Sequence, residues 1–424
     1  MKSRKTLYVL LGSVLLIAVI LSAAGYLIHS LPTVETEEEV SNEEEPGRKR
    51  KKPTLGTLED EEVEVGIEPY TFSKAKKQSV GKVQDVNQGE VSEGYHSIDE
   101  VYPYLKTTGR TVLTDAGLCL DWSNASFTMR GNFDGEVKMQ MRFIGGSSQI
   151  YGYLYVYVDG NEESPRIIKA NNGVSWYTLA NVSKGYHTIQ VVKINEAQFG
   201  VMDVIAFDFM GTLQEKAEKS AIQMEFIGDS ITCGADMIES AINTVDAQNG
   251  QKTYAALTAK ALNADASFIS AAGYRLCYCD DGNTKMVLPN IYGKASGIRE
   301  NANMGNNGDW DFASNKTDVV VINLGTNDTV LVNKGRSEEI TSAALSFLKV
   351  VREKNPNAII VWCYGAMTDV GSAEIQAAIN TFGDAKTYFL DVTQNNNGLA
   401  SHPNEEGHQI IANELIAFLK SKLG

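Results

Sequence analysis

Residues 224–234 read MEFIGDSITCG, an apolar run that ends in a glycine and continues into Asp229, Ser230 and a second glycine. An apolar run of this length, bounded by turn residues, is typical of a buried strand. A serine at the turn from a strand into a helix lies near the positive end of the helix dipole, and glycine neighbours permit a sharp bend and close substrate approach. Ser230 is therefore a candidate nucleophile, with a simple helix cap as the alternative.

Further apolar runs follow this stretch and alternate with helical segments. The runs are residues 268–269, 319–324, 359–362 and 388–390, and the clearest helical segments are 337–352 and 404–422. Apolar strands that alternate with helices predict a parallel sheet covered on both faces, and hence a three-layer α/β/α domain over residues 220–424. Ligands of such sheets bind beyond the carboxyl ends of the strands.

Two more polar groups follow strands in this way. The sequence Gly325-Thr326-Asn327-Asp328 comes directly after the run 319–324, and His402 precedes Pro403 and the N-cap Asn404 of the last helix. The Asn327 amide can donate to a developing oxyanion, although a loop turn is the alternative. A hydroxyl, an amide and an imidazole are thus predicted at one edge of the sheet.

Upstream, residues 90–212 have the pattern of an antiparallel domain. Residues 135–144 alternate apolar and polar side chains, and 151–158 alternate four tyrosines with Gly, Leu and Val. Short strands without helices between them predict a β-sandwich or jelly roll. The tyrosines could form a sugar-stacking platform, but we favour the interpretation that they cover a sheet face or a domain interface.

The N-terminus predicts a membrane segment and a linker. Residues 7–28 carry no charge and follow Lys2, Arg4 and Lys5; as a helix they reach about 33 Å, enough for a bilayer core. We therefore expect an uncleaved anchor within residues 1–30, with a cleavable signal peptide as the alternative, and export of everything that follows. Residues 31–89 are predicted to be a disordered acidic linker.

Composition excludes several classes of protein. A formal charge of −15 argues against binding nucleic acid through its phosphates, which requires a basic surface. Five cysteines, with Cys277 and Cys279 one residue apart, exclude a disulfide scaffold and match no paired zinc motif. No metal site or cofactor is expected, and the cysteines are interpreted as buried or weakly reactive thiols.

Together, the GDS block, the GxND block and the HP block resemble the SGNH (GDSL-like) hydrolase family over roughly the last 200 residues. A looser match is the glycine block Ala271-Ala272-Gly273-Tyr274. The resemblance implies Ser230 as nucleophile and His402 as general base and acid. It also implies an oxyanion hole made of the backbone N–H groups of Ser230 and Gly273 and the Asn327 side chain.

The block before the histidine departs from the family pattern. The family usually has an Asp two or three residues before the catalytic His, whereas this chain has Leu399, Ala400 and Ser401, and the nearest preceding carboxylate is Asp391. We therefore predict a Ser-His dyad whose imidazole is oriented by a backbone carbonyl, Ser401 or water. His408 is a competing base, but its place within a helix favours a surface or packing role.

A jelly-roll-like unit before an SGNH unit resembles the family 2 carbohydrate esterases, which remove acetyl groups from polysaccharides such as xylan and mannan. The resemblance implies an O-acetylesterase, and the N-terminal segment predicts that it lies at the outer face of the membrane or is secreted. Members often carry an Asp-Trp pair before the HP, where this chain has Ala400-Ser401; Tyr274 and Trp310 are the nearest candidate substrate contacts in its place, although a structural role is favoured for both. The alternatives are an SGNH esterase acting on cell-wall glycans or lipids, and an inactive glycan-binding surface protein.

Overall fold

The computed structural model describes residues 94–146, 151–238, 240–279 and 285–423, all of which belong to one compact unit. The predicted anchor within residues 1–30 and the predicted linker 31–89 lie outside the described residues. Among the helices that are described, none is long and apolar enough to span a membrane.

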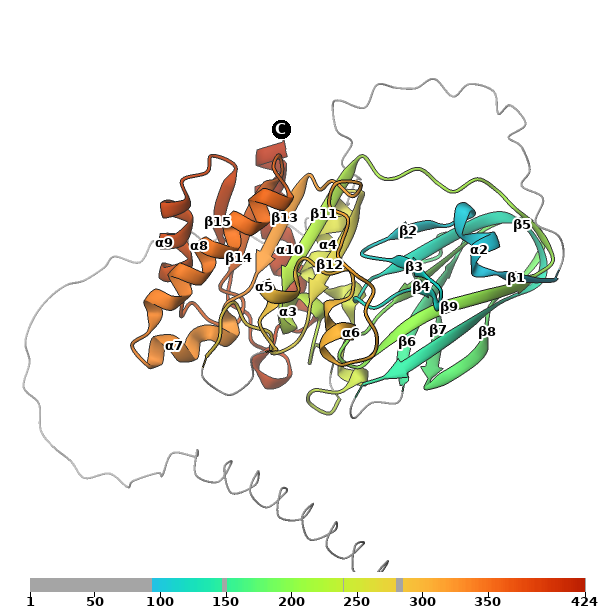
Figure 1. Ribbon diagram of the computed structural model, residues 1–424, viewed down its shortest axis with the longest axis horizontal. Helices are drawn as coiled ribbons and strands as arrows, with labels where there is room; N and C mark the ends of the chain where they lie inside the picture. Colours follow the sequence, from blue (N-terminus) through green and yellow to red (C-terminus); the bar gives the residue numbers. More distant parts are fainter. Residues whose placement is uncertain (1–93, 147–150, 239, 280–284, 424) are drawn as a thin grey trace, which may run out of the picture. The chain divides into compact units, whose positions relative to one another are not determined.

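The first half of the described chain is a single antiparallel sheet (Figure 1). Its strands are β1 (Gly94–Ser97), β2 (Lys106–Thr108), β3 (Val112–Thr114), β4 (Gly117–Cys119), β5 (Ser126–Gly145), β6 (Tyr151–Val158), β7 (Arg166–Asn171), β8 (Gly173–Lys193), β9 (Gly200–Phe209) and β10 (Gly211–Leu213). The main path runs β3-β4-β9-β5-β8-β6-β7, with β1 on β9 and with β2 and β10 on β5. The prediction of an antiparallel unit is confirmed.

The long strands β5 and β8 organise this sheet. They pair along almost their whole lengths, and their register shifts between Phe133 and Gly135 and again between Val137 and Lys138. Such shifts bend a strand and increase its twist. The apolar members of the alternating stretch in β5, Val137, Met139, Met141 and Phe143, are all buried in one cluster, as the period of two predicts.

The second half contains a five-stranded parallel sheet in the order β12-β11-β13-β14-β15. Its strands are β11 (Ile222–Gly228), β12 (Ala264–Ser270), β13 (Val319–Asn323), β14 (Ile359–Tyr364) and β15 (Thr387–Asp391). The helices are α3 (Ser230–Cys233), α4 (Tyr254–Ala261), α5 (Leu288–Ile291), α6 (Gly297–Asn301), α7 (Thr329–Asn333), α8 (Ser337–Lys354), α9 (Ser372–Phe382) and α10 (Glu405–Leu423).

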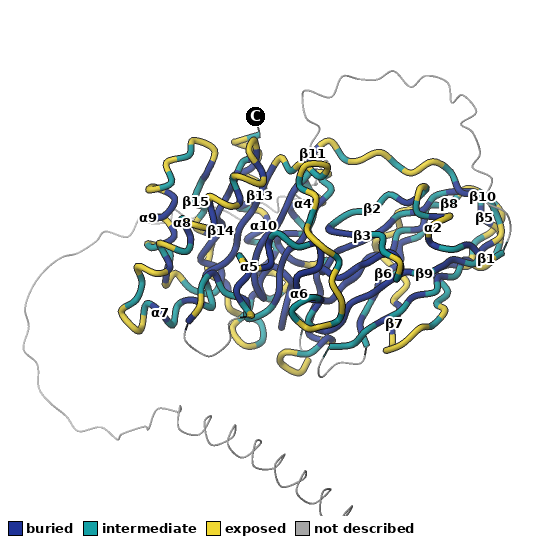
Figure 2. Tube along the Cα trace, viewed as in Figure 1, coloured by how far each residue is buried: buried dark blue, intermediate teal, exposed yellow. Residues whose placement is uncertain are grey.

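Helices cover both faces of the parallel sheet, which confirms the predicted three-layer architecture. Val320 and Ile322 of β13 pack in one cluster with residues of α8 and α9, whereas Val319 and Val321 pack in another with residues of α4 and α10. Figure 2 shows the central strands as buried. The strand that follows β11 in the chain, β12, lies on one side of β11, whereas the later strands β13, β14 and β15 lie on its other side. The strand order therefore reverses at β11, and a ligand crevice is expected beyond its carboxyl end.

The tyrosines of β6 face residues of the α/β part. The hydroxyls of Tyr151 and Tyr153 donate to the carboxylate of Asp246 at 2.8 and 2.6 Å, and Asn249 donates to the Tyr155 hydroxyl at 3.1 Å. Hydrogen bonding to Asp246 raises the pKa of Tyr151. The interpretation of this row as an interface is confirmed.

Candidate active site

Ser230 opens helix α3 at the carboxyl end of β11, where the sequence predicts a nucleophile. Asp229 is the N-cap of this helix, and its Oδ1 accepts a hydrogen bond from the Ile231 N–H at 3.1 Å. The Ser230 residue is 6% exposed. Burial raises the pKa of the Asp229 carboxyl to about 7. The motif thus contains both the predicted serine and a cap.

A cavity of about 450 Å³ lies against Ser230 and also against His402, Gly273 and Asn327. The structure therefore brings together the four residues to which the sequence assigned the nucleophile, the base and the oxyanion hole. The remaining lining residues are Glu196, Gln198, Phe199, Ala235, Asp236, Asn243, Ala272, Met286, Thr326 and Met367.

His402 is held through one ring nitrogen. Its Nδ1 lies 3.2 Å from the carbonyl oxygen of Leu399 and 3.6 Å from Oδ2 of Asp236. Its Nε2 is buried and has no hydrogen-bond partner among the described residues. An imidazole fixed at Nδ1 with Nε2 uncommitted can accept a proton from a serine hydroxyl. A backbone carbonyl at this nitrogen is one of the three partners that the sequence predicted.

The loop that carries Gly273 is braced by the antiparallel part. Glu196 Oε2 accepts a hydrogen bond from the Ala272 N–H at 2.8 Å, and the Gln198 side-chain amide donates to the Ala272 carbonyl at 2.8 Å. Gly273 itself has φ of +75°, and a Cβ there would lie 2.8 Å from the terminal methyl of Met286. The loop conformation therefore requires glycine.

Asn327 contacts the same loop. Its Nδ2 donates to the Tyr274 carbonyl at 2.9 Å and lies 3.4 Å from Oδ2 of Asp229. The next residue, Asp328, accepts hydrogen bonds from the N–H groups of Leu276 and Cys277, both at 2.9 Å. The GTND segment thus positions the loop that follows β12, and the oxyanion role of the Asn327 amide stays a prediction.

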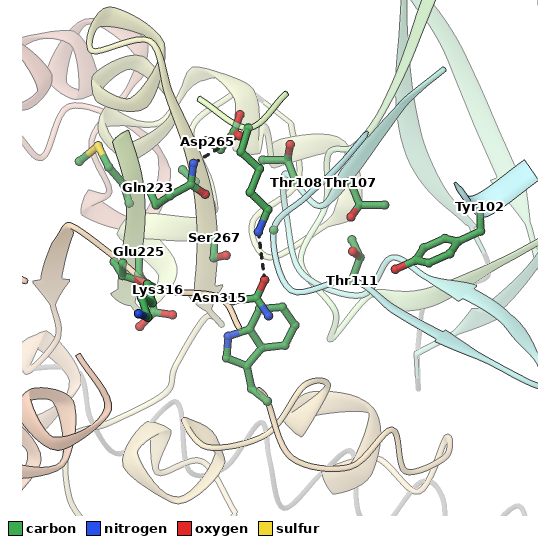
Figure 3. A pocket seen from close by; sticks show the side chains of 16 residues that line it. Tyr102, Thr107, Thr108, Thr111, Gln223, Glu225, Asp265, Ser267, Asn315 and Lys316 are labelled. Carbon is green, nitrogen blue, oxygen red and sulfur yellow. Dashed lines mark hydrogen bonds between the residues drawn. The ribbon is translucent and has the colours of Figure 1, made fainter. Parts of the chain in front are cut away.

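The two candidate substrate contacts lie away from this cavity. Tyr274 is only 3% exposed, its hydroxyl accepts from Asn301 at 3.2 Å, and it lines a neighbouring cavity. Trp310 lines a polar cavity of about 160 Å³, shown in Figure 3, and lies 5.5 Å from the Arg110 guanidinium. That cavity adjoins Gln223 and Asp265, near the amino ends of β11 and β12.

His408 packs inside the α/β part, as the sequence predicted. Its Nδ1 accepts a hydrogen bond from the Tyr254 N–H at 3.1 Å, and the two rings stack with an interplanar angle of 6°. Burial lowers the pKa of His408 to about 3. An imidazole in this environment is neutral at physiological pH and does not face the Ser230 cavity.

The cysteines and the other titratable groups add no metal centre. The five free cysteines are buried or partly buried, and burial raises the pKa of the thiols of Cys119, Cys233, Cys277 and Cys363. The part of the chain that the structure describes contains no group of three or more His, Cys, Asp or Glu side chains able to hold a metal ion.

Sequence reasoning missed three of the polar groups around the cavity. Asp236 lies two residues beyond the GDSITCG block, and this short separation from Ser230 is the signal that could have identified it. Glu196 and Gln198 lie in the loop between β8 and β9, and a polar pair between two apolar strands does not reveal its partner.

Part of the chain that contains the candidate site is similar to a known protein family. Residues 226–410 match the GDSL-like Lipase/Acylhydrolase family. The match covers the α/β part of the chain, which is therefore similar to this family. The span of the match runs from β11 to the last helix and includes Ser230, Gly273, Asn327 and His402.

Similar proteins extend across both halves of the described chain. The cellulase/esterase CelE of Acetivibrio thermocellus is 30% identical over 355 residues, which are 78% of this chain and 41% of CelE. An acetylxylan esterase/glucomannan deacetylase of Cellvibrio japonicus is 23% identical over 79% of this chain and 93% of its own length. The chain thus spans about two fifths of the first relative and nearly all of the second.

A solved structure shares the arrangement. A family two carbohydrate esterase from Clostridium thermocellum, in complex with cellohexaose, has a TM-score of 0.66 and 28% sequence identity, with 76% of this GDSL-like chain and 99% of that chain covered. The likeness covers the antiparallel sheet as well as the hydrolase sheet, since the hydrolase match alone spans residues 226–410.

Proposed function

We propose that this GDSL-like protein is a serine esterase that removes O-acetyl groups from polysaccharides of the xylan or mannan type. The observation that carries the proposal is the convergence of Ser230, His402, Gly273 and Asn327 on one cavity at the carboxyl end of β11. The names of similar proteins, which include acetylxylan esterase and glucomannan deacetylase, support this choice of ester.

The chemistry is acyl transfer in two halves. Ser230 Oγ attacks the acetyl carbonyl while His402 Nε2 takes its proton, and the N–H groups of Ser230 and Gly273, together with the Asn327 amide, stabilise the tetrahedral anion. The bond to the sugar oxygen then breaks, and His402 returns the proton to that oxygen. Water next attacks the acetyl-serine while His402 takes a proton from it, and His402 then returns this proton to Ser230 Oγ as the acyl–oxygen bond breaks and acetate leaves.

The site also favours a small neutral substrate. A cavity of about 450 Å³ lies in the lower half of the range for ligand pockets, roughly 300–1,000 Å³. A formal charge of −15 disfavours anionic polymers, whereas acetylated xylan and mannan backbones are neutral. These features support an acetylated polysaccharide over a long-chain lipid.

We further propose that the domain 90–212 is a jelly roll and that the enzyme works outside the cytoplasm, held by an anchor in residues 1–30 or released after cleavage there. The uncharged stretch 7–28 supports export. The alternatives remain an esterase for cell-wall glycans or lipids, and an inactive glycan-binding protein, which the absence of an Asp directly before His402 favours.

Acetate release tests these proposals. The full chain and a Ser230→Ala variant are incubated with acetylated xylan, acetylated mannan and nitrophenyl acetate. We expect release by the parent protein and background rates for the variant. Equal background rates for both proteins would refute the esterase. Faster cleavage of long-chain esters than of acetates would support the lipid alternative.

A further inference from the structure

The Asp236 carboxylate and the His402 ring lie within ion-pairing distance of each other beside the cavity. Oδ2 of Asp236 lies 3.6 Å from Nδ1 of His402, and their side chains are only 6% and 12% exposed. Among the described residues, Asp236 is the only carboxylate in ion-pair contact with this histidine. The contact is made at the ring nitrogen opposite to Nε2, which is the nitrogen that faces the proton-transfer step.

The surrounding backbone holds Asp236 in this position. Its other oxygen, Oδ1, accepts a hydrogen bond from the Asn243 N–H at 2.5 Å, and its carbonyl accepts from the Leu399 N–H at 3.1 Å. Asp236 has φ of +52°, a left-handed conformation that Asp and Asn tolerate better than most residues. Because Oδ1 is hydrogen-bonded and the backbone is fixed, Oδ2 of Asp236 is held in place facing His402.

The segment before His402 is built against the same aspartate. The Leu399 carbonyl accepts from the His402 N–H at 2.9 Å, and the two intervening residues, Ala400 and Ser401, both have positive φ. A Cβ on Gly398 would lie 2.7 Å from the His402 carbonyl oxygen and 3.3 Å from that of Asp236. This tight turn occupies the place where a family member would carry its own carboxylate.

We propose that Asp236 is the positioning carboxylate of His402, so that the site works as a Ser230-His402-Asp236 triad whose acid comes from the loop after the nucleophile helix. The inference rests on the proposed esterase function and deepens it. When Nε2 takes the serine proton, the ring becomes a cation that keeps its Nδ1 hydrogen. Asp236 stabilises that cation and orients the ring, and no proton passes to the carboxylate.

Other charged groups near His402 do not supply this interaction. Glu196 lines the same cavity but accepts hydrogen bonds from the Ala272 N–H and from the side chains of Gln198 and Gln248. His408 is the neighbouring imidazole, and its pKa of about 3, lowered by burial, leaves it uncharged. The Leu399 carbonyl contributes a dipole to Nδ1 but no full charge.

Asp236→Asn tests the role in the full-length protein. Asn keeps the shape, tolerates the left-handed backbone and can still accept from Asn243 through its oxygen. Its NH₂ group then faces His402 Nδ1, so the change removes both the charge and the acceptor at that nitrogen. We expect kcat on nitrophenyl acetate to fall by about 10²-fold with little change in KM. This loss is smaller than the ~10⁴-fold that removal of a triad aspartate can cause, because Leu399 still holds the ring. The acid limb of the pH–rate profile is expected to move to lower pH.

Asp391→Asn is the matched control, because Asp391 is the carboxylate that most nearly precedes His402 in the chain. This variant should keep the parental kcat and pH profile. In a Ser230→Ala background, Asp236→Asn should cause no further loss, since residues that act as one unit are not additive. An Asp236→Asn protein with parental kcat and an unshifted acid limb would overturn the proposal.

The outcome can be read even if the esterase proposal fails. Failure of that function appears as equal background rates for the parent and Ser230→Ala. In that event, NMR titration of the His402 ring in the parent and in Asp236→Asn still tests the contact. A midpoint at lower pH in the variant supports it, because loss of the carboxylate disfavours the ring cation. An identical midpoint in the two proteins overturns it.

Discussion

At its carboxyl end, strand β11 leads to Ser230, and at its amino end it adjoins a second cavity lined by Gln223 and Glu225 (Figure 3). Both cavities include residues of the antiparallel part and of the α/β part. At the carboxyl end these residues meet through hydrogen bonds to a loop backbone. At the amino end, Arg110 pairs with Glu225 at 2.9 Å, and both side chains are buried.

The contacts at the two ends of β11 are expected to have different effects, one on catalytic rate and the other on stability. The Glu196 and Gln198 side chains fix the Ala272 backbone, so their effect passes to the loop that carries Gly273, the proposed oxyanion loop. Arg110 instead donates to Glu225 and stacks on the Tyr292 ring at 5.0 Å, deep between the two parts. Removing one partner of a buried pair leaves an uncompensated charge. Changes to Glu196 or Gln198 should therefore alter rate, and changes to Arg110 should alter folding.

The largest effect is expected from Ser230→Ala. Because the nucleophile is lost, kcat on nitrophenyl acetate should fall by about 10⁴-fold or more, while the midpoint of thermal unfolding stays near that of the parent protein. Thr232→Ala in the same helix is a useful comparison, since Thr232 donates to or accepts from Tyr254 and does not line the cavity. Retained activity in Ser230→Ala would show that another residue is the nucleophile.

Arg110→Met should change the stability of the protein and not its catalytic rate. We expect the free energy of unfolding to fall by about 3–5 kcal/mol, because Glu225 remains buried without its cation. Denaturant unfolding measures the change. Adding Glu225→Gln should restore part of the loss. Lys138→Met, which breaks an exposed pair with Glu136, is the control and should cost less than about 1 kcal/mol. An equally small loss in Arg110→Met would contradict the division between the two ends.

Asp229 should give the carboxyl end a pH-dependent stability. Its pKa is raised to about 7 by burial, so the folded protein holds this proton more tightly than the unfolded chain does. Stability therefore falls as pH rises from about 4 to about 7, by up to about 4 kcal/mol. His408 acts in the opposite direction, since its lowered pKa makes stability fall as pH drops below about 6.5.

The Asp229 contribution is isolated by comparing Asp229→Asn with the parent protein at each pH, because His408 is common to both. Asn retains a side-chain oxygen for the Ile231 N–H. The variant should gain stability relative to the parent as pH rises through this window. A constant difference between the two unfolding profiles from pH 4 to pH 8 would show that Asp229 does not titrate in this way.

Glu196→Gln should lower the catalytic rate, by less than Ser230→Ala does. Glu196 accepts from Ala272 through one oxygen and from Gln248 through the other, so an amide in its place must present an N–H to one of these donors. We expect kcat to fall by about 10-fold as the oxyanion loop loosens. Glu163→Gln, at an exposed position of the antiparallel part, is the control. An unchanged kcat in Glu196→Gln would show that the contact between Glu196 and Ala272 does not contribute to catalysis.

The smallest effect is expected from Trp310→Ala. Trp310 lines the amino-end cavity, so kcat/KM on acetylated xylan should remain within about two-fold of the parent value, with a modest loss of stability from the missing cation–π contact. A raised KM on xylan with an unchanged rate on nitrophenyl acetate would instead support the predicted substrate contact.

Much of the site could be predicted because its chemistry follows strand ends. Ser230, Gly273 and Asn327 come directly after β11, β12 and β13, and parallel strands bring such residues to one edge of the sheet. Tyr274 shows where this reasoning stops. It adjoins Gly273 in sequence, yet its ring is buried, because the direction of a side chain in a loop depends on packing that periodicity does not report.

The sequence by itself determined the antiparallel unit, the parallel α/β/α unit and the order of the candidate residues Ser230, Asn327 and His402. Local periodicity and strand-end motifs carry this information. Only the tertiary structure decided which distant groups support them. Asp236 meets His402 from a loop 166 residues earlier in the chain, and Glu196 meets Ala272 from the other sheet. Contacts between loops depend on how the chain returns on itself in space, and no local pattern encodes that return.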